Sequence, residues 1–355
     1  MPFTAFELQE AGKLALDFFE KNKPVDQVNT ERPLLKFLKS KQKTAPGNKE
    51  NIVEQLRKSN SSNFQWFNGS EIVTYNKRYN IEQSQYAWRS AHDGFALDED
   101  RLIQNGIQVT DEGPGGKFSK AERLQLSNLL EEEVDALDVG FEEKFDQALH
   151  LDGTQDTDAV VGLDALVSLT PAVGVVGSLD ASSYTFWRNH VATGLTTTTT
   201  TGTILTQMEI AWRACIRNGG RPDFILVGSN FLDGLRNFML STYGRIDYGP
   251  MQKKNFDAGS GMMSTNTNLF FNGVELVWDP VFADLDTIYS PGTPWEKRCY
   301  FLNSRHIRLR PIEGQDMITR KPPRAYNKYE YYWGKTWRGG MTSNRRNANA
   351  VLAIA

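Results

Sequence analysis

Residues Ser119 to His150 read SKAERLQLSNLLEEEVDALDVGFEEKFDQALH and carry the clearest pattern in the chain. The segment opens with Ser119 and, three residues later, Glu122, a capping box that satisfies two backbone N–H groups at the start of a helix. Bulky apolar residues then recur every three or four positions, and most carboxylates fall between them. The spacing predicts one amphipathic helix whose buried face is made of Leu126, Leu130, Val134, Leu137, Phe141, Phe145 and Ala148.

This helix would be long for a single compact domain. At about 1.5 Å per residue it would run roughly 45 Å, and its apolar period of about 3.67 residues is that of a straight helix. We therefore expect it to lie on a sheet or on a neighbouring subunit. Gly140 costs about 1 kcal/mol relative to alanine in a helix interior and is the place where the helix would bend or break. Glu131, Glu132 and Glu133 point in three directions, so they predict an acidic face and not an acid/base pair.

Composition and charge place this chain among globular proteins. Its 355 residues, 39% of them hydrophobic, allow one large domain or two to three smaller ones. A formal net charge of −3 argues against a protein that covers nucleic acid with positive charge. The charge is uneven, because residues 119–150 hold three basic and nine acidic residues, whereas residues 303–346 hold eleven basic and three acidic ones. We expect these two regions to attract each other, within a chain or between chains.

The chemistry of several common protein classes is missing from the sequence. The two cysteines, Cys215 and Cys299, argue against a disulfide framework and against a cysteine zinc site, and suit a reducing cytoplasm. The first twenty residues lack the basic start and apolar core of a signal peptide. No run of 18 apolar residues is present, so no membrane span is expected.

The sequence contains no complete phosphate loop and no complete nucleophile elbow. Gly116-Lys117 lacks the spacing and the following hydroxyl of a phosphate loop, and Ser260 lacks the glycine two positions before it that a nucleophile elbow needs. Four histidines, at positions 92, 150, 190 and 306, show no metal-ligand spacing and are interpreted as structural or surface residues. We expect no catalytic residue, no cofactor and no metal.

The amino-terminal third predicts surfaces that need a cover. Residues 1–62 form a polar arm with one apolar patch at Leu34–Leu38, either a flexible tail or an arm that orders against a neighbour. Asn68-Gly69 is a strong hairpin signal between Phe64–Phe67 and Ile72–Tyr75. An isolated hairpin cannot bury its own aromatic rings. The cover would be the rest of the domain in a monomer, or the next subunit in an assembly.

The rest of the chain predicts a mixed α/β region. The expected helices lie over Ile204–Ile216 and from Ser229 onward, with a strand at Phe224–Val227 between them. Tyr243–Thr267 is expected to be a mobile loop. Aromatic and basic residues interleave between Arg305 and Arg346, which suits either base stacking or one face of a strand, and we favour the strand. Further strands are expected at Val160–Leu169, Leu269–Phe271, Val274–Trp278, Cys299–Leu302, His306–Leu309 and Tyr326–Trp337, with an edge strand at Ala348–Ala355.

The order of these parts resembles that of the major capsid proteins of tailed bacteriophages with the HK97 fold. The resemblance is carried by the Asn68-Gly69 ribbon upstream of the Ser119–His150 helix and by the stretch Gly219–Val227 between two helices. It implies an α+β, HK97-like fold made of five parts: residues 1–62 as the arm, 63–112 as the extended hairpin loop, 113–155 as the spine helix, 156–300 as the axial domain and 301–355 as return strands.

The resemblance also implies a function. The protein would be a structural subunit, not an enzyme, that assembles as pentamers and hexamers into an icosahedral shell around double-stranded phage DNA. Scaffolding and portal proteins would be its partners, contact with DNA would be nonspecific, and it would be assembled in the host cytoplasm into the virion. An encapsulin-like cellular compartment and, less well supported, a soluble enzyme are the alternatives. The expected subunit interface includes Phe64, Trp66, Asn68, Gly69, Tyr75, Glu131, Glu132 and Arg338.

Overall fold

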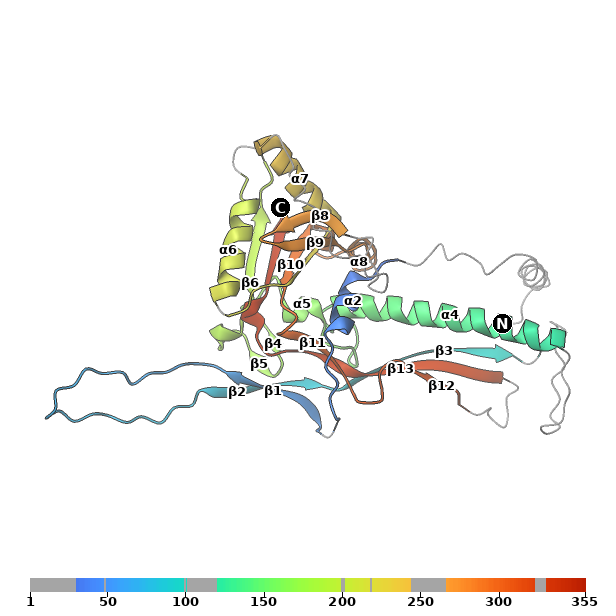
Figure 1. Cartoon of the computed structure of the whole chain (residues 1–355), viewed down its shortest axis with the longest axis horizontal. Helices are drawn as coiled ribbons and strands as arrows, with labels where there is room; N and C mark the ends of the chain where they lie inside the picture. The colour runs from blue at the N-terminus through green and yellow to red at the C-terminus, as the bar shows by residue number, and fades with distance from the viewer. Residues whose placement is uncertain are drawn as a thin grey trace. The chain divides into compact units, whose positions relative to one another are not determined.

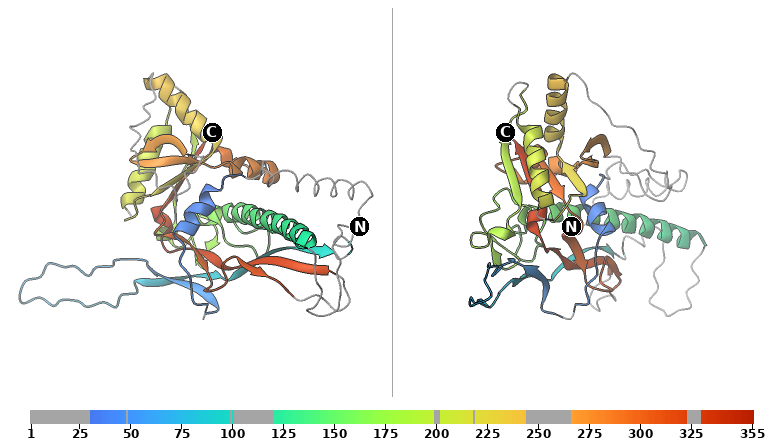
Figure 2. Two further views of the ribbon diagram at one scale, coloured as in Figure 1. Left: turned by 45° about the vertical axis from the view of Figure 1, so that its right-hand side comes forward. Right: turned by 60° about the vertical axis from the view of Figure 1, so that its left-hand side comes forward.

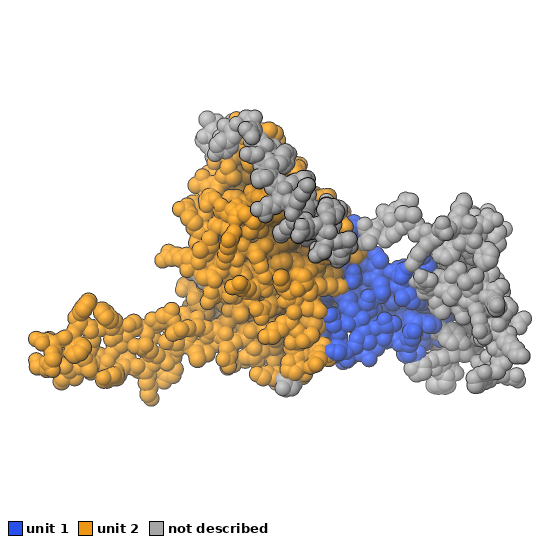
Figure 3. Space-filling view, viewed as in Figure 1, with its two compact units in different colours: residues 1–30, 90–145, 314–338 blue, residues 31–89, 146–313, 339–355 orange. Residues whose placement is uncertain are grey.

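The computed structural model describes residues 30–47, 49–98, 100, 120–198, 202–217, 219–243, 266–322 and 330–355. The chain divides into two compact units, each assembled from segments far apart in the sequence. Unit 1 comprises residues 1–30, 90–145 and 314–338, and unit 2 comprises residues 31–89, 146–313 and 339–355 (Figure 3).

The long helix predicted from the sequence is present as α4 (Lys120–His150). It continues through Gly140 without interruption, so a break into two helices there is wrong. Leu137, Phe141 and Phe145 are buried, which confirms the predicted face over the second half of the helix. The cap residue Ser119 and the side chains of Leu126 and Leu130 lie outside the described residues.

Within unit 1, α4 lies on a sheet strand, as expected. The Phe145 ring is 4.6 Å from the ring of Trp337, a fully buried residue of β13 (Glu330–Ser343). Lys335 of the same strand donates to Asp138 of the helix at 2.9 Å. This ion pair confirms, for one residue of each region, the predicted attraction between the acidic helix and the basic tail.

Strand β13 is longer than predicted and has several partners. It pairs antiparallel with β12 (Ile318–Arg320) and, nearer its end, with β11 (Ile307–Pro311). It also pairs with β3 (Arg89–Asp98). Trp333 stacks on Phe95 of β3 at 5.9 Å between ring centroids. The aromatic tail is therefore a strand, the interpretation favoured from the sequence.

Unit 2 is built around a six-stranded sheet in the order β6-β14-β10-β7-β9-β8. The β6–β14 and β7–β9 pairs are parallel and the other neighbours antiparallel. Figure 1 shows this sheet beside α6 and α7. The bounds are β6 (His190–Leu195), β7 (Phe224–Val227), β8 (Asn266–Phe271), β9 (Val274–Trp278), β10 (Arg298–Leu302), β14 (Ala350–Ile354), α6 (Ile204–Arg217) and α7 (Ser229–Tyr243).

Both faces of this sheet are covered. Successive side chains of a strand point to opposite faces, and Ile225 and Val227 of β7 pack with α6 and α7 in one apolar cluster. On the other face Tyr300 lies 6.0 Å from the ring of Phe282 in α8 (Val281–Tyr289). The helix-strand-helix unit predicted around Phe224–Val227 is confirmed, whereas α8 was not predicted.

One hairpin turn and the position of β14 complete the sheet. Asn272 and Gly273 both have positive φ, at 49° and 81°, and join β8 to β9 as the predicted hairpin. The predicted edge strand at the end of the sequence is wrong in its position, because β14 lies inside the sheet between β6 and β10. Its residues Ala350–Ala353 are fully buried, as their small apolar side chains allow.

The predicted arm is also partly integrated into unit 2. Helix α2 (Pro33–Ser40) begins with proline in its first turn, which suits that position, and its Leu34, Leu35 and Leu38 are fully buried. The expectation that this patch is a flexible tail, or orders only against a neighbour, is therefore wrong for α2. The following β1 (Asn51–Arg57) was not predicted either; it pairs with β2 (Ile81–Ala87).

Smaller elements complete unit 2. The strand expected at Val160–Leu169 is wrong, since the segment forms the short helix α5 (Leu163–Leu166). Strands β4 (Val175–Val176) and β5 (Leu179–Asp180) form a two-stranded hairpin. Three 3₁₀ turns are η1 (Thr185–Trp187), η2 (Trp295–Lys297) and η3 (Arg346–Ala348). The predicted loop at Tyr243–Thr267 lies almost wholly outside the described residues.

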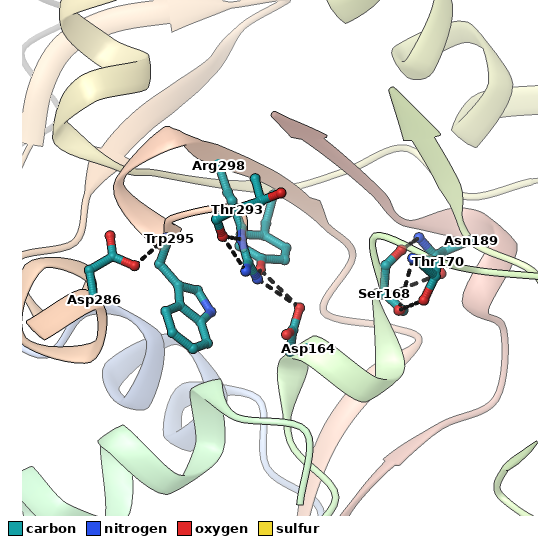
Figure 4. A network of polar contacts seen from close by, with 9 residues as sticks. Asp164, Ser168, Thr170, Asn189, Asp286, Thr293, Trp295 and Arg298 are labelled. Carbon is teal, nitrogen blue, oxygen red and sulfur yellow. Dashed lines mark hydrogen bonds and ion pairs between the residues drawn. The ribbon is translucent and has the colours of Figure 1, made fainter. Parts of the chain in front are cut away.

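A buried arginine joins α5 to the sheet (Figure 4). Arg298 donates to Asp164 at 2.9 Å and, through two of its nitrogens, to the main-chain oxygen of Thr293 at 2.6 and 3.0 Å. Its guanidinium lies 4.6 Å from the Trp295 ring, and the Tyr300 hydroxyl is a further partner at 3.1 Å. All three guanidinium nitrogens are thus paired, so the arrangement is structural.

Candidate interaction surface

The most exposed apolar side chains of unit 2 lie on one projection. Residues 58–80, which we call the extended loop, connect β1 to β2. Their outgoing and returning segments run side by side away from the β1–β2 sheet (Figures 1 and 2). Trp66, Ile72 and Tyr75 are 89%, 93% and 92% exposed. Other exposed apolar residues of the loop and its foot are Phe64, Phe67, Tyr79 and Ile81.

The foot of the extended loop is firmly held. β1 and β2 pair over seven residues each, from Asn51↔Ala87 to Arg57↔Ile81. Tyr86, which is buried, donates through its hydroxyl to the main-chain oxygen of Ser343 at 3.0 Å. Burial raises the pKa of Tyr86, so its hydroxyl keeps its proton. The loop therefore starts from a fixed base.

The outgoing and returning segments of the extended loop are linked mainly by side-chain hydrogen bonds. Lys58 N donates to Asn80 O at 2.8 Å just beyond the ladder. Farther out, Asn63 Nδ2 donates to both the main-chain oxygen and the hydroxyl of Thr74, and Asn76 donates to Asn63 at 3.3 Å. The strands predicted at Phe64–Phe67 and Ile72–Tyr75 do not form, since these residues have no strand pairing. Their rings have no second layer to pack against within the described part of unit 2.

The predicted turn at Asn68-Gly69 is present at the tip of the loop, but its backbone geometry differs from that of a paired hairpin. Glu71 N donates to Asn68 O at 2.8 Å, which closes a four-residue turn. Neither Asn68 nor Gly69 has the positive φ of the turns that favour paired hairpins. The Glu71 carboxylate accepts from Asn68 N at 3.1 Å and stabilises the turn from outside. Both Asn68 and Gly69 are exposed.

Most of the predicted interface residues are exposed, and they are divided between the two units. Phe64, Trp66, Asn68, Gly69 and Tyr75 belong to the extended loop in unit 2. Glu132 and Arg338 belong to unit 1 and are exposed, and the side chain of Glu131 lies outside the described residues. Their role in an interface stays a prediction.

The sequence-based set omitted part of the exposed surface. Ile72 is the most exposed large apolar residue of the loop, and it lies in the segment Ile72–Tyr75 that the sequence predicts to need a cover. Val173, just before β4, and Val175, the first residue of β4, are 72% and 67% exposed and carry no periodic signal. Because a turn rich in small residues gives no clear pattern, these two could not be found from the sequence.

Chemistry of other kinds is limited within the described residues. No three His, Cys, Asp or Glu side chains there are grouped to hold a metal ion. Cys215 and Cys299 are free thiols buried in the sheet region. Among the described helices, none is long and apolar enough to cross a membrane.

Comparison with solved structures shows what this architecture resembles. A chain of the cyanophage A-1(L) capsid asymmetric unit matches with a TM-score of 0.61 and 14% identity, over 94% of this chain and 95% of that one. The chain has the fold of a phage capsid protein.

Two further structures agree with the capsid fold. The capsid of Myoviridae phage XM1 matches with a TM-score of 0.52 and 14% identity, over 100% of this chain and 99% of that one. The capsid of an empty GTA particle matches with a TM-score of 0.52 and 9% identity, over 97% and 99%. No family model matches the sequence, and no curated protein is significantly similar to it. The resemblance drawn from the sequence is thus confirmed for the capsid fold.

Proposed function

We propose that this chain is a major capsid protein with the HK97 fold. Copies of it would assemble as pentamers and hexamers into an icosahedral shell around the double-stranded DNA of a tailed phage. The observation that carries the proposal is the extended loop, which presents apolar side chains to solvent on a chain that matches a phage capsid chain over 94% of its length.

Burial of the extended loop would supply the driving force for assembly. Complete burial of one large apolar side chain contributes about 1.5–3 kcal/mol, and monomeric proteins rarely expose a long row of such groups. A neighbouring subunit provides the missing cover. Because closed symmetry repeats the same contact around each ring, modest contacts give a stable shell.

We assign the parts of the chain on the same basis. Residues 1–62 would be the arm, 63–112 the extended loop region, 113–155 the spine helix, 156–300 the axial domain and 301–355 the return strands. In this assignment the loop of one subunit covers the spine helix of a neighbour, where Glu131, Glu132 and Arg338 would fix the register by charge.

The proposed partners follow from the same role. A scaffolding protein and a portal protein would assist assembly in the host cytoplasm, and the product would be part of the virion. With a net charge of −3 the subunit would contact packaged DNA weakly and without sequence preference. As a structural protein it would need no cofactor.

The test is direct observation of assembly. The full chain is expressed alone and with its candidate scaffolding protein, and the products are examined by negative-stain electron microscopy and mass photometry. Closed shells, or rings of five and six subunits, are the expected products. A monodisperse monomer of 40.1 kDa under every condition would overturn the proposal.

The contents of the shells separate two kinds of compartment. Particles purified from infected cells are treated with nuclease, opened and analysed for DNA and for protein. Protected double-stranded DNA is the result expected of a phage capsid. A single enclosed protein without DNA would instead identify an encapsulin-like compartment of the same fold.

A further inference from the structure

Three titratable side chains are buried together in unit 2, where the end of α4 meets the start of α8. Asp146, His150 and Asp279 are each no more than 1% exposed. His150 Nε2 lies 2.8 Å from Asp279 Oδ2, and His150 Nδ1 lies 2.8 Å from the main-chain oxygen of Asp146. The same Nδ1 atom is 3.7 Å from Asp146 Oδ2.

The geometry fits a doubly protonated His150. A main-chain oxygen only accepts hydrogen bonds, and so does an ionised carboxylate, so both ring nitrogens have to donate. Burial by itself lowers the pKa of His150, but the nearby carboxylates of Asp146 and Asp279 outweigh it and raise the pKa from 6.5 to about 9. Asp279 is held in place because its Oδ1 accepts from Val281 N at 3.0 Å.

This cluster is connected directly to helix α2. Asp146 Oδ1 accepts from the backbone N–H of Leu35 at 3.0 Å, in a buried position. Asp146 Oδ2 has no hydrogen-bond partner among the described residues. The charged groups that face Asp146 are His150 and Asp279 and, from the residue before α2, the buried Arg32. Docking of α2 thus combines three buried leucines with one charge-dependent hydrogen bond.

We propose that the proton on His150 keeps helix α2 docked on the rest of unit 2. We call this proton-dependent contact between Asp146 and α2 the latch. With His150 charged, the two carboxylates are balanced by His150 and Arg32. When His150 loses its proton, one negative charge is left uncompensated in a buried site, which is costly. Exposure of Asp146 to water relieves this cost, but it breaks the Asp146–Leu35 hydrogen bond and frees α2. The latch lies within one chain and does not depend on the proposed function.

The direction of the pH effect follows from where the protons are held. Docked His150 keeps its proton to higher pH than exposed His150, so docking is favoured at low pH and weakens as pH rises from 6.5 to about 9. Burial raises the pKa of Asp146 to about 7, although the His150 charge acts in the opposite direction. Both groups therefore hold protons better in the docked state. The docking equilibrium should fall about tenfold per pH unit across this window.

Amide hydrogen exchange of the full chain tests the latch. Exchange rates of peptides covering α2 and α6 are measured by mass spectrometry from pH 6 to pH 10. Each rate is divided by the rate of an unstructured chain at the same pH to give a protection factor. Protection of α2 is expected to fall at least tenfold, while α6 keeps its protection. Constant protection of α2, or an equal fall in α6, would overturn the proposal.

Two variants separate the latch from a general loss of packing. Asp146→Asn keeps an oxygen for Leu35 N but carries no charge, so α2 should stay protected up to pH 10. His150→Gln removes the charge that favours ionised Asp146, so α2 should be less protected than in the wild type, and the remaining pH dependence should be that of Asp146 alone. If His150→Gln does not fold, the wild type and Asp146→Asn still decide the matter. An Asp146→Asn profile that matches the wild type would contradict the latch.

Discussion

Arg298 shows what a buried charge requires at the scale of single residues. Its three nitrogens find acceptors in Asp164, in the main-chain oxygen of Thr293 and in the Tyr300 hydroxyl. Thr293 and Tyr300 are close to Arg298 in the sequence, but the charged partner Asp164 lies 134 positions away. The same holds for His150 and Asp279, which are 129 positions apart. The sequence therefore could not show that His150 belongs to a charged cluster, although its interpretation as a structural residue agrees with its burial.

Removal of the Arg298 charge should strongly destabilise the subunit. Arg298→Met leaves the Asp164 carboxylate, which is 24% exposed, without its cation, and breaking a pair with one buried partner in this way costs up to about 3–5 kcal/mol. Urea unfolding followed by circular dichroism measures the free energy of unfolding. Arg89→Met is the control, because Arg89 pairs with Asp158, which is 85% exposed, and such pairs contribute at most about 1 kcal/mol. Equal losses in both variants would contradict the structural role of Arg298.

The hydroxyl of Tyr86 should matter for the foot of the extended loop. Tyr86→Phe removes the buried hydrogen bond to Ser343 O and leaves that oxygen without this donor, at a cost of about 1–2 kcal/mol. Tyr79→Phe, in the exposed part of the loop, should leave the free energy of unfolding unchanged. Urea unfolding of the two variants side by side checks this; no difference between them would mean that the Tyr86 bond adds nothing to stability.

At the scale of elements, the sequence was most informative where an element is periodic and locally capped. Helices α4, α6 and α7 and strand β7 were predicted for this reason. Helix α2 was missed because its few apolar residues are surrounded by lysines, even though Pro33 at its start was a usable signal. The interior place of β14 could not be predicted, since a short apolar run fits an edge strand and a central strand equally well.

Gly140 should be replaceable in helix α4. A Cβ atom at this position would meet nothing within 4 Å, and alanine favours the helix interior by about 1 kcal/mol over glycine. Gly140→Ala should therefore raise the free energy of unfolding by that amount, measured by urea unfolding. Gly162→Ala is the opposite control, because its Cβ would clash with the main-chain oxygens of Leu151 and Leu149. Destabilisation by Gly140→Ala would show that the glycine serves another purpose.

At the scale of the whole molecule, the sequence predicted the capsid fold from the order of parts and not from any motif. It could also predict that an aromatic ribbon needs a cover. It could not identify which side chains stay exposed, because Leu34 and Ile72 look alike in sequence, yet one is fully buried and the other almost fully exposed. That distinction arises only from packing.

The extended loop should be needed for assembly but not for folding. The triple variant Trp66→Ser, Ile72→Ser, Tyr75→Ser removes three of its most exposed apolar side chains. Its thermal unfolding should match the wild type, while mass photometry should show subunits in place of shells or rings. Ile288→Ser, which alters an exposed residue of α8, is the control and should still assemble. Normal assembly of the triple variant would exclude the loop as the driving contact.

The interior place of β14 has a consequence for the timing of synthesis. The ribosome makes β6, β7, β8, β9 and β10 first, yet β6 has its neighbour in the sheet only once β14 has been made and inserted. Until residue 354 has left the ribosome, the nascent chain holds an open slot in its core between β6 and β10. A chain cut short before β14 would leave β6 without its neighbour in the sheet, so β14 has to be made before unit 2 can complete this sheet.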